Sequence, residues 1–210
     1  MSKTNYKNLL FDLGGVIMDL KREDCVRAFE ALGMQNAENV FGEYSQTGAF
    51  LALEEGAISV GEFHDEVKTM LPAGVSDEQI DEAFGRFLVG IPMHRLKALE
   101  ELCKNFNIYL LSNTNPIHIH GRIAKYFAID GKKIEDYFDG LVLSYEAKAA
   151  KPNRAIFEYA ISHLNIEAEE TLFIDDSQKN LDAASQLGFG VALVKPGEEF
   201  MNVLSERDVL

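Results

Sequence analysis

Four short polar stretches of the sequence carry side chains that can do chemistry, and each of them follows an apolar run. In a parallel β-sheet the carboxyl ends of the strands meet at one edge, where ligands bind. If the apolar runs are strands, the polar side chains behind them converge at that edge. In chain order, the stretches are centred on Asp12, on Ser112 with Asn113, on Lys151, and on Asp175 with Asp176.

The first and last stretches supply anionic groups. Asp12 is a candidate nucleophile, and Gly14 and Gly15 behind it let the backbone approach a ligand closely. Asp12 together with Asp175 or Asp176 would form an oxygen-rich site. Such a site suits Mg²⁺, because this hard cation prefers oxygen ligands.

The two middle stretches supply hydrogen-bond donors and a positive charge. The Ser112 hydroxyl and the Asn113 backbone amide can donate to phosphate oxygens, and the Lys151 ammonium offsets negative charge. Phosphoryl transfer to a carboxylate needs all these parts, because an anionic nucleophile must approach an anionic phosphate. We therefore predict that Asp12, Ser112 and Lys151 are catalytic, and that Ser112, Asn113 and Lys151 bind the substrate.

Five runs are continuously apolar rather than alternating, which is typical of parallel strands covered by helices on both faces. Helical periodicity separates the later runs, for example over residues 155–164. This alternation predicts an α/β protein with a doubly wound, Rossmann-like core and a five-stranded parallel sheet. The predicted strands are residues 8–11, 108–111, 141–143, 172–174 and 191–194.

A long insertion interrupts the first crossover. About 95 residues separate the first two runs, where a complete βαβ unit needs only about 30. Capping-box signals at Ser59 and Ser76 indicate helices within it. We predict a helical cap domain over residues 18–90, inserted into a core domain of residues 1–17 and 91–210. A cap that closes over the strand ends would exclude water from a reacting centre.

The bulk composition narrows the choice of partners. The formal net charge of -14 argues against nucleic acid, because no basic excess is present to neutralise its phosphates. No window approaches the roughly 20 apolar residues of a membrane span, and residues 1–7 are polar. We expect a cytoplasmic monomer or weak dimer whose partner is a small phosphorylated metabolite.

The cysteines and two of the histidines invite a metal interpretation that their spacing does not support. Cys25 and Cys103 lie far apart without metal-type spacing, so we expect both to be reduced and buried. His118 and His120 alternate without a third ligand nearby, and we expect them at the surface with no role.

The four motifs, in this order and spacing, resemble the haloacid dehalogenase (HAD) superfamily, and the insertion is similar to a helical cap of that superfamily. Most similar are bacterial sugar-phosphate phosphatases of the group that includes α-D-glucose-1-phosphate phosphatase, whose first motifs read Phe-Asp-Leu-Gly-Asn-Val-Ile and Ser-Asn-Thr-Asn. The resemblance implies a Mg²⁺-dependent phosphatase in which Asp12 forms an aspartyl-phosphate. It also implies that the Gly14 carbonyl joins Asp12, Asp175 and Asp176 as a metal ligand.

One position departs from that pattern. Gly14 stands where most phosphatases of the superfamily carry a second aspartate, which acts as general acid and base. Such help contributes about 10² to 10⁴ in rate, so its loss should slow turnover with poor leaving groups. An anomeric phosphate, as in a glucose 1-phosphate, is a better leaving group. Asp19 either substitutes in part or is a solvated hinge carboxylate, and we favour the second interpretation.

Two other functions remain compatible with an aspartate nucleophile. A hydrolytic 2-haloacid dehalogenase also uses one, but it needs no metal and has little use for the paired carboxylates Asp175 and Asp176. A non-catalytic sugar-phosphate-binding protein would not need an anionic nucleophile that faces an anionic ligand.

Substrate selection is expected to reside in the insertion. Phe50, Glu55 and Gly56 are the candidates for contact with the substrate. The acidic pair of Glu54 and Glu55 is expected to form a solvated helix face.

Overall fold

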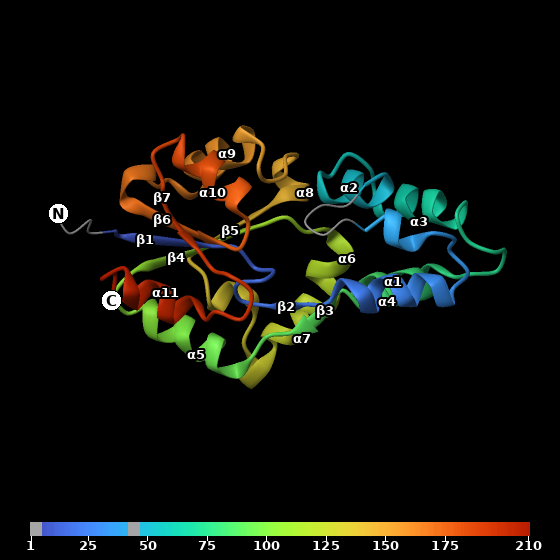
Figure 1. The fold of residues 1–210 in the computed structure, drawn as a ribbon, viewed down its shortest axis with the longest axis horizontal. Helices are drawn as coiled ribbons and strands as arrows, with labels where there is room; N and C mark the ends of the chain where they lie inside the picture. The colour runs from blue at the N-terminus through green and yellow to red at the C-terminus, as the bar shows by residue number, and fades with distance from the viewer. Residues whose placement is uncertain (1–5, 42–46) are drawn as a thin grey trace.

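The structure, a computed structural model, describes residues 6–41 and 47–210, so residues 1–5 of the polar N-terminal segment and 42–46 of the insertion lie outside the described residues. Among the described residues, five parallel strands form one sheet in the order β5-β4-β1-β6-β7, which confirms the predicted α/β class (Figure 1). The strands are β1 (Asn8–Phe11), β4 (Asn107–Ser112), β5 (Gly140–Leu143), β6 (Thr171–Asp175) and β7 (Gly190–Leu193).

Helices lie on both faces of this sheet. In Figure 1, α5 and α11 lie below it and α9 and α10 lie above it. The helices of this part of the chain are α5 (Met93–Leu102), α6 (Pro116–His118), η2 (Ile119–Ile123), α7 (Ala124–Phe127), η3 (Ile129–Gly131), η4 (Ile134–Asp136), α8 (Ser144–Ala147), α9 (Arg154–Leu164), η5 (Ala168–Glu170), α10 (Gln178–Ser185) and α11 (Phe200–Glu206).

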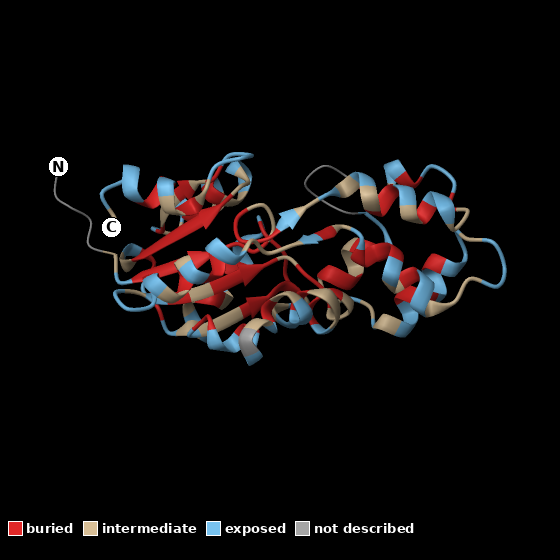
Figure 2. Cartoon of the chain, turned by 90° about the horizontal axis from the view of Figure 1, so that it is seen from below, coloured by how far each residue is buried: buried red, intermediate tan, exposed pale blue. Residues whose placement is uncertain are grey.

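The central strand β1 is buried on both faces, as its continuous apolar run requires. Leu9 and Phe11 belong to the same hydrophobic cluster as Phe200 of α11, whereas Leu10 belongs to a second cluster with Phe157 of α9. Successive side chains of a strand point to opposite faces, so one run serves both layers. Figure 2 shows the resulting band of buried strands. This rigid sheet fixes the positions of the residues that follow its strands.

The insertion between β1 and β4 builds a further group of helices with its own core. Phe50 lies at the centre of that core and is fully buried, with the Phe41 and Phe50 ring centroids 4.7 Å apart. The prediction that Phe50 contacts the substrate is therefore wrong, because its ring serves packing. The elements of the insertion are α1 (Arg22–Ala31), η1 (Ala37–Asn39), α2 (Ala49–Glu54), α3 (Val60–Lys68) and α4 (Asp77–Gly85).

The helix starts in the insertion follow the sequence signals, but one helix face does not. Both capping boxes form, at Ser59 before α3 and at Ser76 before α4. Glu54 was expected on a solvated face and is instead 9% exposed, while Glu55 is half-buried. Burial of Glu54 raises the pKa of its carboxyl to about 8, with a smaller contribution from Glu55.

Two short strands that the sequence did not predict stand where the chain enters and leaves the insertion. They are β2 (Asp19–Leu20) and β3 (Leu88–Gly90), and they pair antiparallel (Figure 1). This ribbon brings the entry and exit of the insertion side by side. The chain therefore passes between the sheet and the helices α1 to α4 through two paired strands.

Two smaller expectations are also resolved. Cys25 is buried as predicted, but Cys103 is exposed, because it lies just beyond the end of α5 at the surface. In the part of the chain that the structure describes, no helix combines the length and the apolarity needed to cross a bilayer.

Candidate active site

Lys151 joins two aspartates at the edge of the sheet formed by the carboxyl ends of the strands. Its Nζ lies 2.7 Å from Asp12 Oδ1 and 2.8 Å from Asp175 Oδ2, and it donates to the Leu111 carbonyl at 3.0 Å. The Lys151 side chain is 1% exposed and that of Asp175 is 0% exposed. Buried charges are tolerated when they are paired and hydrogen-bonded, and this cluster meets both conditions.

The Asp175 carboxylate accepts hydrogen bonds from several groups of the protein. Its Oδ1 accepts from the Ser177 amide at 2.8 Å and from Asn180 Nδ2 at 3.0 Å, in addition to the Lys151 contact of Oδ2. Four lone-pair directions of this carboxylate are thus largely occupied by donors of the protein. Asp175 is therefore suited to hold Lys151 in place.

Asp176 lies against the glycine pair behind Asp12. A Cβ built on Gly15 would stand 2.2 Å from Asp176 Oδ2, and Gly15 has φ +72°. Only glycine combines this backbone conformation with such a close approach. The second glycine of the motif therefore makes room for the Asp176 carboxylate beside Asp12.

The three aspartates fit a divalent cation. Ligand oxygens of Asp12, Asp175 and Asp176 lie within 4.8 Å of one another. Oxygen donors with clustered negative charge are what Mg²⁺ prefers. The donor chemistry therefore agrees with the ion that the sequence predicts.

The electrostatics of the site depend on burial and mutual repulsion. Burial raises the pKa of Asp12 to about 7, while Lys151 opposes this shift and the neighbouring aspartates add to it. Burial and the Asp175 charge raise the pKa of Asp176 to about 6. A cation between these carboxylates would stabilise their ionised forms, because nearby positive charge favours the carboxylate. The charge of the site therefore also fits a divalent cation.

Side-chain hydrogen bonds hold residues 113 and 114 at the start of the loop after β4. Asn113 Nδ2 donates to the Lys151 carbonyl at 3.0 Å, and Asn113 Oδ1 accepts from the Lys151 amide at 2.8 Å. Ser144 Oγ accepts from the Thr114 amide at 2.9 Å and donates to the Thr114 carbonyl at 3.0 Å. The sequence did not predict that the Asn113 side chain binds the backbone of Lys151. Ser112 ends β4, directly before these residues, and is buried.

Asp19 lies in β2 and is committed to an ion pair. Arg95 Nη1 lies 2.8 Å from Asp19 Oδ1 and donates to the Ile17 carbonyl at 3.3 Å. The same guanidinium binds both carboxylate oxygens of Glu199 at 2.9 Å. Arg95 therefore ties the entry strand of the insertion to the helical layer below the sheet. This role fits the interpretation of Asp19 as a hinge carboxylate.

Gly56, His118 and His120 differ in their surroundings. Gly56 lies where α2 meets α8, and its carbonyl accepts from Lys148 Nζ at 2.7 Å. His120 is exposed as expected, but His118 is 4% exposed, so the surface prediction for His118 is wrong. Its partner is a backbone carbonyl of Phe84, 34 residues away, which no local pattern reveals.

Comparison with known proteins agrees with this arrangement. The family model of haloacid dehalogenase-like hydrolases matches residues 6–188. D-ribitol-5-phosphate phosphatase of Bacteroides thetaiotaomicron is 35% identical over 199 residues, which cover 95% of this chain and 97% of that protein. A phosphorylated carbohydrates phosphatase of Thermotoga maritima is 26% identical, over 94% of this chain and 98% of that protein.

A solved structure is similar over nearly its whole length. It is a HAD family enzyme from Bacteroides thetaiotaomicron, in an aspartate-to-alanine mutant form complexed with magnesium and inorganic phosphate. It is 42% identical, with a TM-score of 0.91, and the match covers 95% of this chain and 98% of that one. With its motifs, sheet order and family match in agreement, this chain belongs to the haloacid dehalogenase-like hydrolase family.

Proposed function

We propose that this protein is a Mg²⁺-dependent phosphatase that hydrolyses a small phosphorylated sugar or polyol through an aspartyl-phosphate on Asp12. The observation that carries the proposal is the ammonium of Lys151, which lies 2.7 Å from Asp12 and 2.8 Å from Asp175. A carboxylate held by a buried ammonium group at the strand ends is positioned to act as a nucleophile rather than as a helix cap or turn former.

The chemistry follows in two steps. An oxygen of Asp12 attacks phosphorus, the bond from phosphorus to the ester oxygen breaks, and that oxygen keeps the electron pair and takes a proton from solvent to leave as the alcohol. A water molecule then attacks phosphorus and gives up a proton to solvent, the bond to Asp12 breaks, and phosphate leaves with the carboxylate restored. Lys151 offsets the negative charge in both steps, and Ser112 and the Asn113 amide donate to phosphate oxygens.

The proposed metal ligands are Asp12, the Gly14 carbonyl and the Asp175–Asp176 pair. Asp176 is the better direct ligand of the pair, because Asp175 is already bound to Lys151, to a backbone amide and to Asn180. A bound Mg²⁺ would supply positive charge between the nucleophile and the phosphate.

Two further features belong to the proposal. We assign residues 18–90 to a cap domain and residues 1–17 and 91–210 to the core domain, because the α1 to α4 helices have their own hydrophobic cluster. The substrate class rests on the two relatives, whose names describe phosphatases of a phosphorylated polyol and of phosphorylated carbohydrates. The paired carboxylates beside Asp12 favour this activity over dehalogenation.

Location and assembly are also part of the proposal. We infer a cytoplasmic monomer or weak dimer that binds neither nucleic acid nor membranes, from the formal net charge of -14 and from the composition. Sedimentation of the purified protein tests the assembly state. A stable tetramer would overturn it.

The test is a panel of substrates assayed for phosphate release. D-ribitol 5-phosphate, glucose 1-phosphate, glucose 6-phosphate, a nucleotide and p-nitrophenyl phosphate are compared with Mg²⁺ and with EDTA. We expect turnover of the polyol and sugar phosphates that disappears with EDTA and returns with Mg²⁺. Turnover of p-nitrophenyl phosphate with an Asp12→Ala variant, or the absence of any turnover in the unmodified protein, would contradict the proposal.

A further inference from the structure

We propose that His118 is a positioning residue that couples helix α4 of the insertion to the loop after β4, so that this phosphate-binding loop takes its working shape only when α4 is seated. The inference rests on the proposed function, because it takes residues 112–115 as the loop that binds phosphate. It adds a role for a histidine that the proposed chemistry does not use.

The hydrogen bonds of His118 define its tautomer and its two partners. Asn115 Oδ1 accepts from the His118 amide at 3.0 Å, so the amide nitrogen of Asn115 faces the ring and donates to Nδ1 at 3.2 Å. Because Nδ1 accepts, Nε2 carries the proton and donates to the Phe84 carbonyl at 3.3 Å. One neutral ring therefore bridges the loop and the end of α4.

The surroundings keep the ring in this state. His118 is 4% exposed and Asn115 is 0% exposed, and the Phe84 ring centroid lies 4.1 Å from that of His118. Burial lowers the pKa of His118 to about 4, and Arg122 adds to this effect. The bridge is thus neutral, dry and closely packed, and losing either hydrogen bond leaves a buried polar group without its partner.

The chain after His118 repeats this contact with the insertion. Arg122 Nη2 lies 2.6 Å from Glu82 Oε1 of α4, and the Tyr126 hydroxyl donates to the Leu88 carbonyl at 3.1 Å. His118, Arg122 and Tyr126 are spaced by four residues, so they lie along one side of a helical segment. This segment runs directly from the phosphate-binding loop, and its three contacts all go to residues 82–88.

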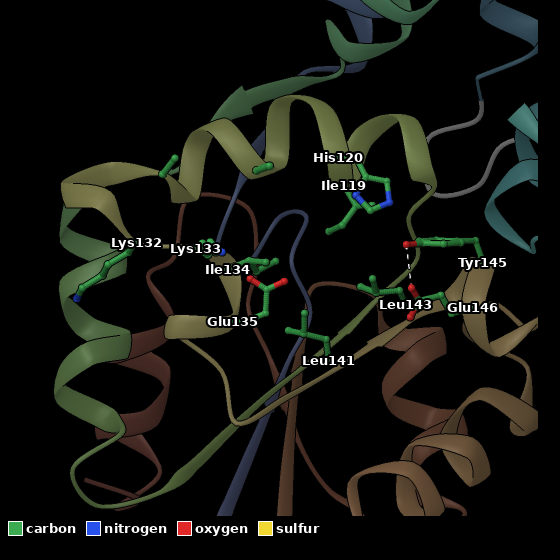
Figure 3. A pocket seen from close by; sticks show the side chains of 12 residues that line it. Ile119, His120, Lys132, Lys133, Ile134, Glu135, Leu141, Leu143, Tyr145 and Glu146 are labelled. Carbon is green, nitrogen blue, oxygen red and sulfur yellow. Dashed lines mark hydrogen bonds between the residues drawn. The ribbon is translucent and has the colours of Figure 1, made fainter.

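The same segment contains a π-helix, η2, and borders a pocket. Short π-helical turns are rare and occur frequently at functional sites. A pocket of about 470 Å³ separates η2 from the end of β5, with Ile119 and His120 on one side and Leu143 and Tyr145 on the other (Figure 3). Ile119 and Ile123 of η2 are buried in the main core cluster, so η2 packs on the core and borders the pocket on one side. The other side of the loop is fixed, because Ser144 holds Thr114.

The test separates the two hydrogen bonds of His118. The side-chain amide of Gln matches Nε2 of histidine, so His118→Gln keeps the donor to Phe84 and loses the acceptor for Asn115. The shorter Asn matches Nδ1, so His118→Asn keeps the loop contact and loses the contact with α4. Lys125→Ala, an exposed residue of α7 in the same segment that does not line the pocket, is the control.

The readout is the binding of inorganic phosphate with Mg²⁺ present, measured as competitive inhibition, together with KM and kcat. Coupling predicts that both variants weaken phosphate binding by about tenfold, the usual effect of one lost buried hydrogen bond. His118→Asn is the decisive variant, because it weakens phosphate binding while it leaves the loop contact in place. The control should behave as the unmodified protein does. Unchanged phosphate inhibition in both folded variants, with only their melting temperature lowered, would overturn the inference.

Hydrogen exchange tests the coupling without turnover. Adding Mg²⁺ and phosphate to the unmodified protein should slow exchange at residues 84–88 as well as at 113–118, and His118→Asn should abolish the slowing at 84–88. Slowing confined to residues 113–118 in the unmodified protein would contradict the inference. An inactive unmodified protein would instead contradict the proposed function, and the two failures are therefore distinguishable.

Discussion

Replacing Lys151 by methionine removes one charge from the centre of the site while it keeps the length of the side chain. The ammonium contacts Asp12, Asp175 and the Leu111 carbonyl, at 2.7, 2.8 and 3.0 Å. Breaking a buried ion pair by removing one partner costs about 3–5 kcal/mol, because the other charge stays buried. For a protein of this size, about 1 kcal/mol shifts the melting temperature by 2–4 °C. We therefore expect the melting temperature to fall by about 6–20 °C.

The loss of stability caused by Lys151→Met should depend on pH and on Mg²⁺. Lys151 lowers the pKa of Asp12, so its removal raises that pKa further, and the folded variant binds a proton that the unfolded chain releases. Stability of the variant is therefore retained at low pH and lost as pH rises through the raised pKa. Adding Mg²⁺ should recover part of the stability, because the cation offsets the same two carboxylates.

Thermal unfolding at several pH values, with and without Mg²⁺, measures these effects, and phosphate release measures activity. We expect activity to fall by about 10² to 10³, the usual effect of removing one group that stabilises developing charge. Lys179→Met, which removes an exposed lysine of α10, is the matched control. A Lys151→Met variant as stable and active as this control would refute the reasoning.

Three other changes test separate parts of the account. Gly15→Ala places a Cβ 2.2 Å from Asp176 Oδ2 at a φ of +72°, so Mg²⁺ titrations should show weaker activation of this variant. The control Gly61→Ala adds its Cβ in open space and should be activated as the unmodified protein is. Equal activation of the two variants would contradict the role of Gly15. Glu54→Gln should remove a loss of stability that the unmodified protein shows as pH rises from about 4.5 to about 8, because between these pKa values the folded state binds a proton that the unfolded chain has released. Denaturation at a series of pH values across this window measures the loss, and unchanged pH dependence would refute it. Gly14→Asp restores an acid-base group, so kcat for an alkyl phosphate should rise by up to about 10² while that for p-nitrophenyl phosphate stays constant, and an equal change in both would contradict this role.

The sheet and the convergence of its polar strand ends were predictable from local sequence. Continuously apolar runs such as residues 9–11 require burial on both faces, so helices have to cover both sides of the sheet. Asp12 and Asp175 then have to meet, because Asp12 follows β1 and Asp175 ends β6, and these two parallel strands are neighbours. Capping boxes mark helix starts for a similarly local reason, since the side chain binds an amide three residues away.

The features that sequence reasoning missed depend on partners distant in the chain. The strand β2 has two residues, too few for any alternation to show. The buried His118 ring donates a hydrogen bond to a carbonyl of α4, and Glu54 is buried although its neighbour Glu55 is not. Asp19 binds Arg95, 76 residues away. Tertiary contacts, rather than composition or periodicity, decided each of these positions.

The central claim is that Asp12 receives the phosphoryl group, and mass spectrometry of the acid-quenched enzyme tests it most directly. The protein is mixed with Mg²⁺ and D-ribitol 5-phosphate, quenched within one turnover and digested. We predict one added phosphoryl group on the peptide that contains Asp12, and its absence when EDTA replaces Mg²⁺. Phosphate released at full rate while that peptide stays unmodified throughout, or the phosphoryl group on another residue, would contradict the account.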